Sequence, residues 1–395
     1  MKTLRFASRL AAKPLACLAL ATLAAGLAQA QSFTNFNSGS TGTVDLVITS
    51  NTTLALPQEG ILHYRNITIN SGSTLTFSNN PLNTPVYLLA ASNVLISGSI
   101  DVSGKPGSGY VPGEGGRGGF SGGFGAYASG SQAGVGDGKG PGGGKGFFCN
   151  VNGCTAYGGT FSYGNILCAP LVGGSGGAGA PINNGVTPGG GGGGGGGGIL
   201  IAANGWITNN GAIMAQGGAG GNLGGYRGAA GSGGAIRLVA PLVSGAGSLN
   251  VGSPGGYGRM RIDSTNRDAS LTIQLTPPTA VSATRGSQGF VFPQDNRLTI
   301  TNVTAGSNTY SLNPSTPASI SLPAGPAITN AIVEVRAEGQ FYGATTVPIA
   351  VVVTPENGAS ATYTNSISIS NNAGSTNVTV TIPTGTTSTL HVWTR

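Results

Sequence analysis

The sequence predicts an all-β protein: a parallel β-helix with a long glycine-rich insertion, followed by an immunoglobulin-like β-sandwich. Three observations predict this fold. Short runs of β-forming residues alternate with polar residues, three segments of the chain repeat one another, and a glycine-rich stretch separates the first two repeats. No segment of the mature chain has a helical period, and its many Gly and Pro residues would break most helices.

The first thirty residues have the features of a bacterial signal peptide. Four basic residues precede the apolar stretch Leu15–Leu27, and Ala28-Gln29-Ala30 fits a cleavage site. We therefore expect a mature chain that begins at Gln31 and is exported to the periplasm, the cell surface or the medium. Because four of the 18 basic residues lie in this segment, the remainder is nearly neutral. It shows no nucleic-acid-binding pattern, and no later apolar run is long enough to predict a transmembrane segment.

Residues 31–262 are predicted to form the β-helix, because they contain repeated units of short strands. Three segments superimpose: Val86–Gly104, Ile199–Gly217 and Ile236–Ser253. A weaker copy is Ile61–Phe77, with Gly72 at the position of the repeated glycine. Such units cannot bury an apolar face alone, but stacked coils can. An antiparallel sandwich built from the same strands is the alternative. The following positions correspond in the three strong copies: Val86, Ile199 and Ile236; Leu88, Ile201 and Leu238; Val94, Ile207 and Val243; Gly98, Gly211 and Gly247; Ile100, Ile213 and Leu249.

The glycine-rich insertion, residues 104–198, holds more than half of the 73 glycines, including ten in a row at Gly189–Gly198. Extended glycine segments can lie side by side in the polyproline II conformation, because only glycine permits such close backbone approach. The alternative is a disordered low-complexity loop. We expect a polyglycine segment packed between neighbours and leading into the strand Ile199–Ile201.

Aromatic residues are unusually frequent in this insertion, although a flexible linker has no reason to collect them. Flat rings on a glycine surface suit sugar rings or a second copy of the same surface. We therefore predict ligand-binding contacts at Tyr110, Phe120, Phe124, Tyr127, Tyr157, Phe161 and Tyr163.

The leader, the segment "PVYLLAASNVLISGSIDVSG", the insertion, "GGAIRLVAP" and "GGYGRMRID" together resemble a group of glycine-rich secreted bacterial β-helix proteins, mostly uncharacterised. More loosely, they resemble the pectin-lyase-like β-helix superfamily of adhesins and polysaccharide-active enzymes. The resemblance spans roughly residues 43–262 and implies an extracellular β-helical protein. It carries over no catalytic residue.

Residues 263–395 are predicted to form the immunoglobulin-like sandwich after a linker at Asp263–Ser270. In the segment Val347–Val353 alternate residues are apolar, which predicts one buried and one solvated face. Sandwich strands are predicted at Leu271–Leu275, Leu298–Val303, Ile332–Arg336, Val347–Val353, Ile367–Ile369, Val378–Ile382 and Leu390–Trp393.

The mature chain has three cysteines, and an exported protein is expected to form a disulfide. We predict a bond between Cys149 and Cys154; pairing of Cys154 with Cys168 is nearly as plausible. A metal site is the alternative, but no histidine lies nearby and the spacing does not fit a zinc knuckle. We predict neither a metal nor a cofactor.

The candidates for catalysis are few. The two histidines, His63 and His391, lie in different predicted domains. A polysaccharide lyase or hydrolase would need convergent acids and bases, and the nearest set is Asp101, Lys105, Glu114 and Arg117. Because the equivalents of Asp101 in the other repeats are not acidic, surface charge explains this set better.

The sequence therefore predicts a secreted or cell-surface structural or adhesive protein without enzymatic activity. Its partners would be a polysaccharide, other surface proteins or further copies of itself, bound through the glycine and aromatic insertion. The alternatives are a polysaccharide lyase or glycoside hydrolase on a β-helix, and a subunit of an extracellular fibre or matrix.

Overall fold

A computed structural model describes most of the chain after residue 36. The described residues form strands and turns but no helix, so none of them forms a helix of membrane-spanning length and hydropathy. The described ranges are 37–126, 135–146, 167–168, 170–181, 188–267, 282–286, 297–312, 320–322, 328–338, 345–355, 359–371, 373–384 and 386–394.

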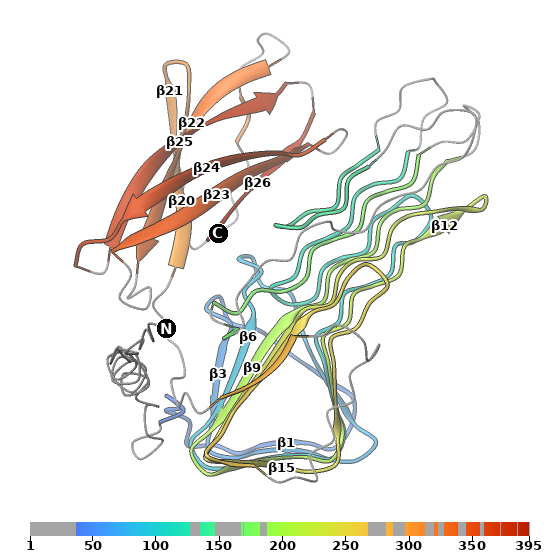
Figure 1. Cartoon of the computed structure of the whole chain (residues 1–395), viewed down its shortest axis with the longest axis vertical. Coiled ribbons are helices and arrows are strands. Elements are labelled where there is room, and N and C mark those ends of the chain that lie inside the picture. Colours follow the sequence, from blue (N-terminus) through green and yellow to red (C-terminus); the bar gives the residue numbers. More distant parts are fainter. Residues whose placement is uncertain are drawn as a thin grey trace, which may run out of the picture.

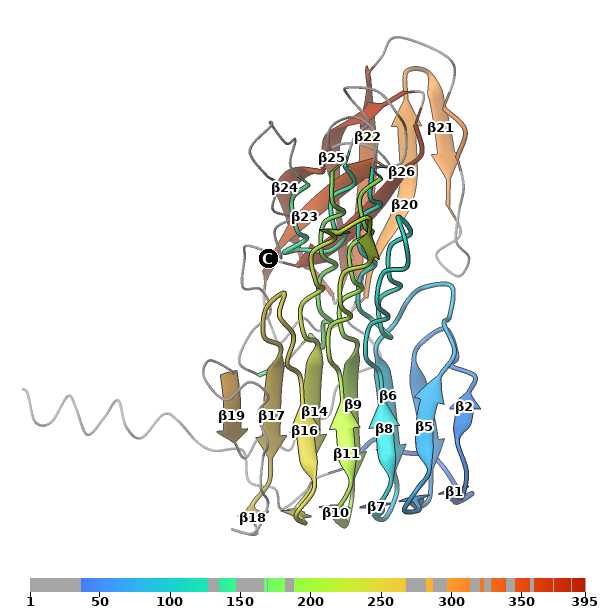
Figure 2. The same ribbon diagram turned by 90° about the vertical axis from the view of Figure 1, so that its right-hand side faces the viewer.

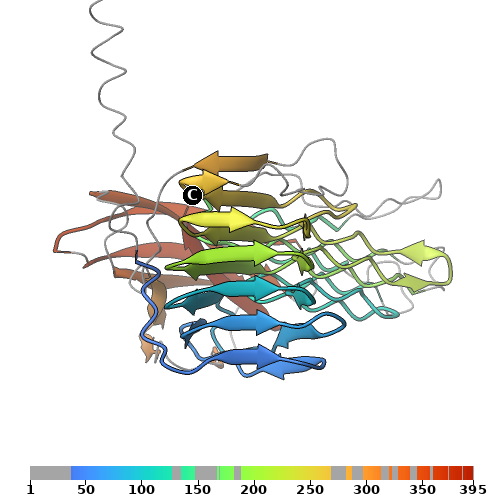
Figure 3. The same ribbon diagram turned by 90° about the horizontal axis from the view of Figure 1, so that it is seen from below.

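Three parallel sheets enclose one triangular core in the N-terminal part, the arrangement of a β-helix (Figure 1). The strands of successive coils lie side by side (Figures 2 and 3). We call these sheets A, B and C, and their strands together the stacked coils. Sheet A contains β1 (Leu46–Ile48), β4 (Ile67–Ile69), β7 (Val94–Ile96), β10 (Trp206–Asn209), β15 (Leu242–Ser244) and β18 (Asn266–Arg267). Sheet B contains β2 (Thr52–Leu54), β5 (Thr74–Phe77), β8 (Ser99–Asp101), β11 (Ala212–Met214) and β16 (Ser248–Asn250). Sheet C contains β3 (Ile61–Tyr64), β6 (Val86–Ala90), β9 (Gly198–Ala203), β14 (Ala235–Val239), β17 (Arg259–Asp263) and β19 (Ser282–Gly286).

The predicted repeats pair in the predicted register. Ile199 lies opposite Val86 on one side and Ile236 on the other, and Ile213 lies between Ile100 and Leu249. These side chains are fully buried in the core. Equivalent apolar residues of successive coils thus stack into ladders inside the triangle, as the alternation of the sequence predicts.

Two details differ from the sequence expectation. In the weak first copy, Thr74 lies opposite Ser99, so Ser73 rather than Gly72 occupies the position next to Gly98. The coils also continue past residue 262: β18 pairs with β15, and β19 pairs with β17. The expected linker and domain boundary at Asp263 are therefore too early. These two strands are short and polar, and they lack the alternation on which the boundary rested.

Glycine-rich excursions leave the coils at one corner only, between a strand of sheet B and the next strand of sheet C. The two long excursions lie between β8 and β9 and between β11 and β14, and a short one connects β16 to β17. They project together from the corner as extended segments (Figures 1 and 3). We call residues 104–126, 135–146, 171–181, 188–197, 215–221, 228–234 and 251–258 the glycine bundle. At the far end, β12 (Asn222–Leu223) and β13 (Tyr226–Arg227) form a small hairpin.

The C-terminal part consists of two antiparallel sheets around a second apolar core, which we call the sandwich. The predicted strand Leu271–Leu275 lies outside the described residues. The four-stranded sheet has the order β21 (Asn308–Ser311), β20 (Arg297–Ala305), β22 (Ile328–Glu338) and β25 (Ala373–Pro383). The three-stranded sheet has the order β24 (Ala361–Ser368), β23 (Thr346–Pro355) and β26 (Ser388–Thr394).

Strand β23 corrects the prediction of one buried and one solvated face. Val351 and Val353 point into the sandwich core, as expected, but Val352 and Thr354 are 3% and 2% exposed on the opposite face. The sequence "IAVVVT" is nearly continuously apolar, which is typical of a strand covered on both sides. The second cover is the glycine bundle, described below.

Candidate functional site

The ten-glycine run is the central segment of the glycine bundle, and each of its ten residues is buried. Its N–H groups donate hydrogen bonds of 2.7–3.0 Å to three neighbouring segments in rotation. Every third residue turns to the same neighbour, which is the period of a polyproline II helix with three residues per turn. Gly189, Gly192 and Gly195 donate to Ala126, Gly123 and Phe120; Gly190, Gly193 and Gly196 donate to Tyr226, Ala229 and Ser232; Gly191, Gly194 and Gly197 donate to Gly109, Lys105 and Val102.

The carbonyl groups of the run accept hydrogen bonds from three further segments. Gly193 accepts from Gly177, Gly194 from Gly218, and Gly192 from Gly113. The run is therefore surrounded on all sides by main chain, and its buried polar groups are paired without water. A Cβ added at any of Gly189–Gly197 would lie closer than 3.0 Å to backbone atoms of a neighbour. This environment explains the ten glycines: each turn of the helix faces another backbone in every direction.

Two turns at the far end of the bundle flank the start of this central segment. Gly190 donates to the carbonyl of Tyr226 at 3.0 Å, and Gly191 donates to that of Gly109 at 2.8 Å. The adjacent carbonyl of Tyr110 accepts from Gly125 at 2.9 Å. The turn between β12 and β13 has two glycines, Gly224 and Gly225, both with positive φ, as a two-residue type I′ hairpin requires. The backbone of both turns is thus fixed to the buried core of the bundle.

The residues of these turns form what we call the distal end: Ser108–Val111 and Asn222–Arg227. Tyr110 and Val111 are 37% and 44% exposed, and Arg227 is exposed as well. This mixture of Tyr, Ser, Asn, Gly and Arg on turns held by a rigid framework is the composition that antibody-like recognition loops use.

The predicted aromatic contacts fall into three groups. Tyr110 lies at the distal end, and Phe124 is half-buried on the segment that leads there. Phe120 instead packs edge-on against His391 and Trp393 of the sandwich, with ring centroids 5.5 and 5.9 Å away. We therefore leave Phe120 out of the open binding surface. Tyr127, Tyr157, Phe161 and Tyr163 lie outside the described residues.

Sequence reasoning missed two tyrosines of the bundle, Tyr226 and Tyr257. The prediction confined the glycine-rich region to one insertion, whereas three successive coils contribute excursions at the same corner. The paired glycines of "GGAGGNLGGYRGAAGSGG" and "SPGGYG" were the available signal. Tyr257, 40% exposed, belongs to the short excursion and lies apart from the two turns of the distal end.

The four residues considered for catalysis come together only in part: Lys105 and Arg117 lie near Glu114, and Asp101 is not among the groups that act on it. Lys105 and Glu114 form an exposed ion pair at 2.7 Å, which holds the pKa of Glu114 below its usual value. Asp101 instead accepts a hydrogen bond from the backbone N–H of Ser103 at 2.8 Å. Arg117 is half-buried, and burial lowers its pKa. Within the described ranges, no three His, Cys, Asp or Glu side chains gather in a way that could hold a metal ion.

A buried ionic cluster lies on the outer side of sheet C, next to the one cysteine of the described part. Asp263 is fully buried and bonds both Arg237, at 2.9 Å, and Arg261, at 2.7 Å. Cys168 is buried and forms no disulfide, and its burial raises the pKa of the thiol to about 11. Such a thiol is protonated at neutral pH and is a poor nucleophile. The predicted pair Cys149 and Cys154 lies outside the described residues.

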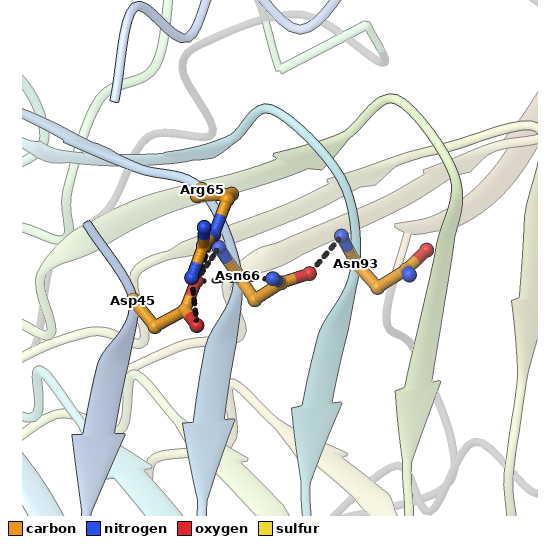
Figure 4. A network of polar contacts seen from close by, with 4 residues as sticks. All are labelled: Asp45, Arg65, Asn66 and Asn93. Atoms are coloured by element: carbon orange, nitrogen blue, oxygen red, sulfur yellow. Dashed lines mark hydrogen bonds and ion pairs between the residues drawn. The ribbon is translucent and has the colours of Figure 1, made fainter. Parts of the chain in front are cut away.

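A ladder of polar side chains crosses sheet A along the N-terminal ends of its strands (Figure 4). The Asp45 carboxylate accepts hydrogen bonds from Arg65 Nε at 2.8 Å and from Asn66 N at 3.1 Å. Asn66 Oδ1 then accepts from Asn93 N, and Asn93 Oδ1 accepts from Trp206 N. Each side chain thereby binds the backbone of the next coil, so we assign the ladder to coil stacking rather than to ligand binding.

The comparisons with known proteins do not identify a family. No protein-family model matches the chain, and no curated protein or solved structure is significantly similar to it.

Proposed function

We propose that this is an exported adhesive protein without enzymatic activity, which binds polysaccharide through the distal end of the glycine bundle. The stacked coils serve as the base and the bundle as a rigid projection. The sandwich, which we infer to be immunoglobulin-like, serves as a second module beside it. Export would follow from the leader at residues 1–30.

One observation carries this proposal: the central glycine segment bonds directly to the turns that present Tyr110 and Tyr226. Binding orders loops and side chains at a cost in entropy, and turns that are already ordered reduce that cost. Tyrosine adds a flat apolar face with a polar edge, which suits a sugar ring. The nearly neutral composition also suits a surface that meets uncharged hydroxyl groups.

The test is retention on insoluble polysaccharides. Protein from Gln31 onward is incubated with a panel of neutral and acidic insoluble polysaccharides, and the bound protein and any new chain ends are measured. We expect retention without new ends, and at least a tenfold loss of affinity in the Tyr110→Ala/Tyr226→Ala double variant. Tyr257→Ala is the matched control, because it removes an exposed tyrosine of the same bundle away from the distal end.

Three outcomes would contradict the proposal. New chain ends that disappear in an Asp101→Asn or Glu114→Gln variant would support the polysaccharide-active enzyme instead. Sedimentation of the protein without any polysaccharide would favour a self-associating fibre or matrix subunit. Equal losses in Tyr257→Ala and in the double variant would place the binding surface elsewhere.

A further inference from the structure

The sandwich contacts one flank of the glycine bundle through the outer face of its three-stranded sheet. On β26, the His391 and Trp393 rings meet Phe120 of the bundle, and Thr389 Oγ1 lies 3.2 Å from Lys139 Nζ. Val352 and Ala350 of β23 lie opposite His391 and Trp393 and share their face. Both are almost completely buried, whereas Thr362 and Thr364 on the same face of β24 are exposed, so the bundle covers the part of this face that β23 and β26 form.

A second set of contacts holds the edge of the same sheet. Asp137 of the bundle is 3% exposed and accepts hydrogen bonds from Ser360 N at 2.6 Å and from Lys145 Nζ at 2.9 Å. Lys145 also donates to Ser360 Oγ at 2.6 Å. These bonds fix the orientation of the sandwich, since Ser360 directly precedes β24.

The interface also contains polar atoms without a hydrogen-bond partner, which could bond to water if the sandwich moved away. Among the described side chains, the buried His391 Nδ1 and Thr354 Oγ1 have no hydrogen-bond partner. A buried polar group without a hydrogen-bond partner is less stable than the same group in contact with water. Both atoms lie on the face turned to the bundle, so undocking would return them to water. The contact therefore combines a stabilising apolar centre with destabilising unpaired polar atoms, as expected of a reversible contact.

The charges around His391 determine how the strength of this contact changes with pH. Apart from Tyr363 of β24, which packs against the sandwich core, His391 is the one ionisable residue in the sequences of β23, β24 and β26. The bundle side contributes Lys139, Lys145 and Asp137, of which Asp137 is paired with Lys145. Burial, and then the charge of Lys139, lower the pKa of His391 to about 4. A proton on this imidazole would lie buried near a lysine, with aromatic rings on the bundle and sandwich sides.

We propose that the sandwich is a detachable cover of the bundle flank, released when His391 takes up a proton. Release uncovers Phe120, the bundle ring that His391 and Trp393 contact. At neutral pH the sandwich occupies this aromatic flank, and in acid the flank becomes free to bind. The distal end stays exposed in both states.

The size of the effect follows from linkage. An undocked, hydrated His391 has the ordinary pKa of 6.5, and the docked residue has about 4. Docking is therefore strongest above pH 6.5 and weakens about tenfold for each pH unit below it, down to pH 4. The total weakening is roughly 300-fold.

The experiment follows Trp393, which lies in the interface. The chain has two tryptophans, so Trp206→Phe leaves Trp393 as the single reporter. Acrylamide quenching of its fluorescence is measured from pH 7 to pH 4, together with the radius of gyration by X-ray scattering and the circular dichroism of the sheets. We expect quenching and radius to rise below pH 6.5 while the circular dichroism stays constant.

Variants of the two histidines of the chain test whether His391 is the group that controls release. His391→Gln and His391→Phe should each remove the transition, and His63→Gln, in the coils, should keep it. In nuclear magnetic resonance of the wild type, the His391 ring should titrate well below the ordinary histidine pKa of 6.5, which tests the burial without any variant at His391. A wild type that stays closed to pH 4, or a His391 variant that opens at the wild-type pH, would overturn the proposal.

Discussion

The stacked coils and the glycine bundle both have a closely packed interior. Side chains fill the interior of the coils, whereas main chain fills the interior of the bundle. In the coils, parallel strands enclose ladders of Ile, Leu and Val side chains, and backbones lie a strand spacing apart within a sheet. In the bundle, main chain alone fills the interior: segments such as 188–197 bond to neighbours in every direction. The coils are thus stabilised mainly by buried apolar area and the bundle by hydrogen bonds and close backbone packing.

The two regions therefore differ in the substitutions that they tolerate. An apolar core can lose or exchange a methyl group at modest cost, because neighbouring side chains adjust. A core of backbone has no side chain that can move aside, so even one added carbon displaces a neighbouring chain.

Gly194→Val should be the most destabilising change. A Cβ at this position would clash with the backbone carbonyl oxygen of Glu114, and no side chain could move aside to remove the clash. We expect a loss of at least about 4 kcal/mol in the free energy of unfolding, measured by chemical denaturation. Ala219→Ser is the control, because Ala219 lies on the exposed side of the same bundle; it should change stability by less than about 0.5 kcal/mol. Equal stability of the two variants would show that the run is not enclosed.

Asp263→Ala should come next, at about 3–5 kcal/mol, because it removes the buried carboxylate shared by Arg237 and Arg261. Glu114→Ala breaks the exposed pair with Lys105 in the bundle and should cost at most about 1 kcal/mol. Thermal unfolding of both variants measures this difference. Similar costs would mean that the cluster outside sheet C is open to water.

Ile201→Val tests the coil side of the contrast. It removes one methyl group from a fully buried ladder residue, and we expect a loss of about 1 kcal/mol. Gly194→Ala, which adds one methyl group, should cost distinctly more. A reversed order in the same denaturation assay would contradict the distinction between the two cores.

Asp45→Asn should have the smallest effect, and one that depends on pH. Hydrogen bonds from Arg65 and Asn66 hold the pKa of the Asp45 carboxyl well below its ordinary value of 3.8. The charged carboxylate therefore stabilises the first coil fully above pH 3.8, and this stabilisation is lost as the pH falls through the lowered pKa. Thermal unfolding at several pH values should show the variant below the wild type at pH 7, with a gap that narrows below pH 3.8. A gap independent of pH would exclude this mechanism.

Much of the coil architecture could be predicted from the sequence, because ladders repeat. The alignment of Val86, Ile199 and Ile236 is confirmed by strand register, and the five sandwich segments predicted from Ile332 onward overlap strands β22–β26. Strands β18 and β19 escaped prediction because pairing with an existing sheet edge requires only backbone groups. Short polar segments such as Asn266–Arg267 can therefore continue a coil without a sequence pattern.

The candidate site was only partly predictable. Glycine-rich composition indicated close backbone packing, but composition carries no information about which segments are neighbours. The hairpin with Tyr226 belongs to a later coil, and the central segment bonds both to it and to Gly109 in the turn that carries Tyr110. Phe120 was indistinguishable in sequence from the other aromatics, although its ring faces the sandwich. Contacts between distant segments decide such differences.

Amide hydrogen exchange of the ten-glycine run measures whether the bundle has an enclosed backbone core. The run is enclosed and hydrogen-bonded, so the amides of Gly189–Gly197 should exchange as slowly as those of the adjoining strand β9, within about tenfold. The amides of Gly224 and Gly225 at the distal turn, by comparison, should exchange faster. Exchange of the run at the rate of an unstructured glycine peptide would contradict the account, because the bundle would then lack the backbone core from which its function is inferred.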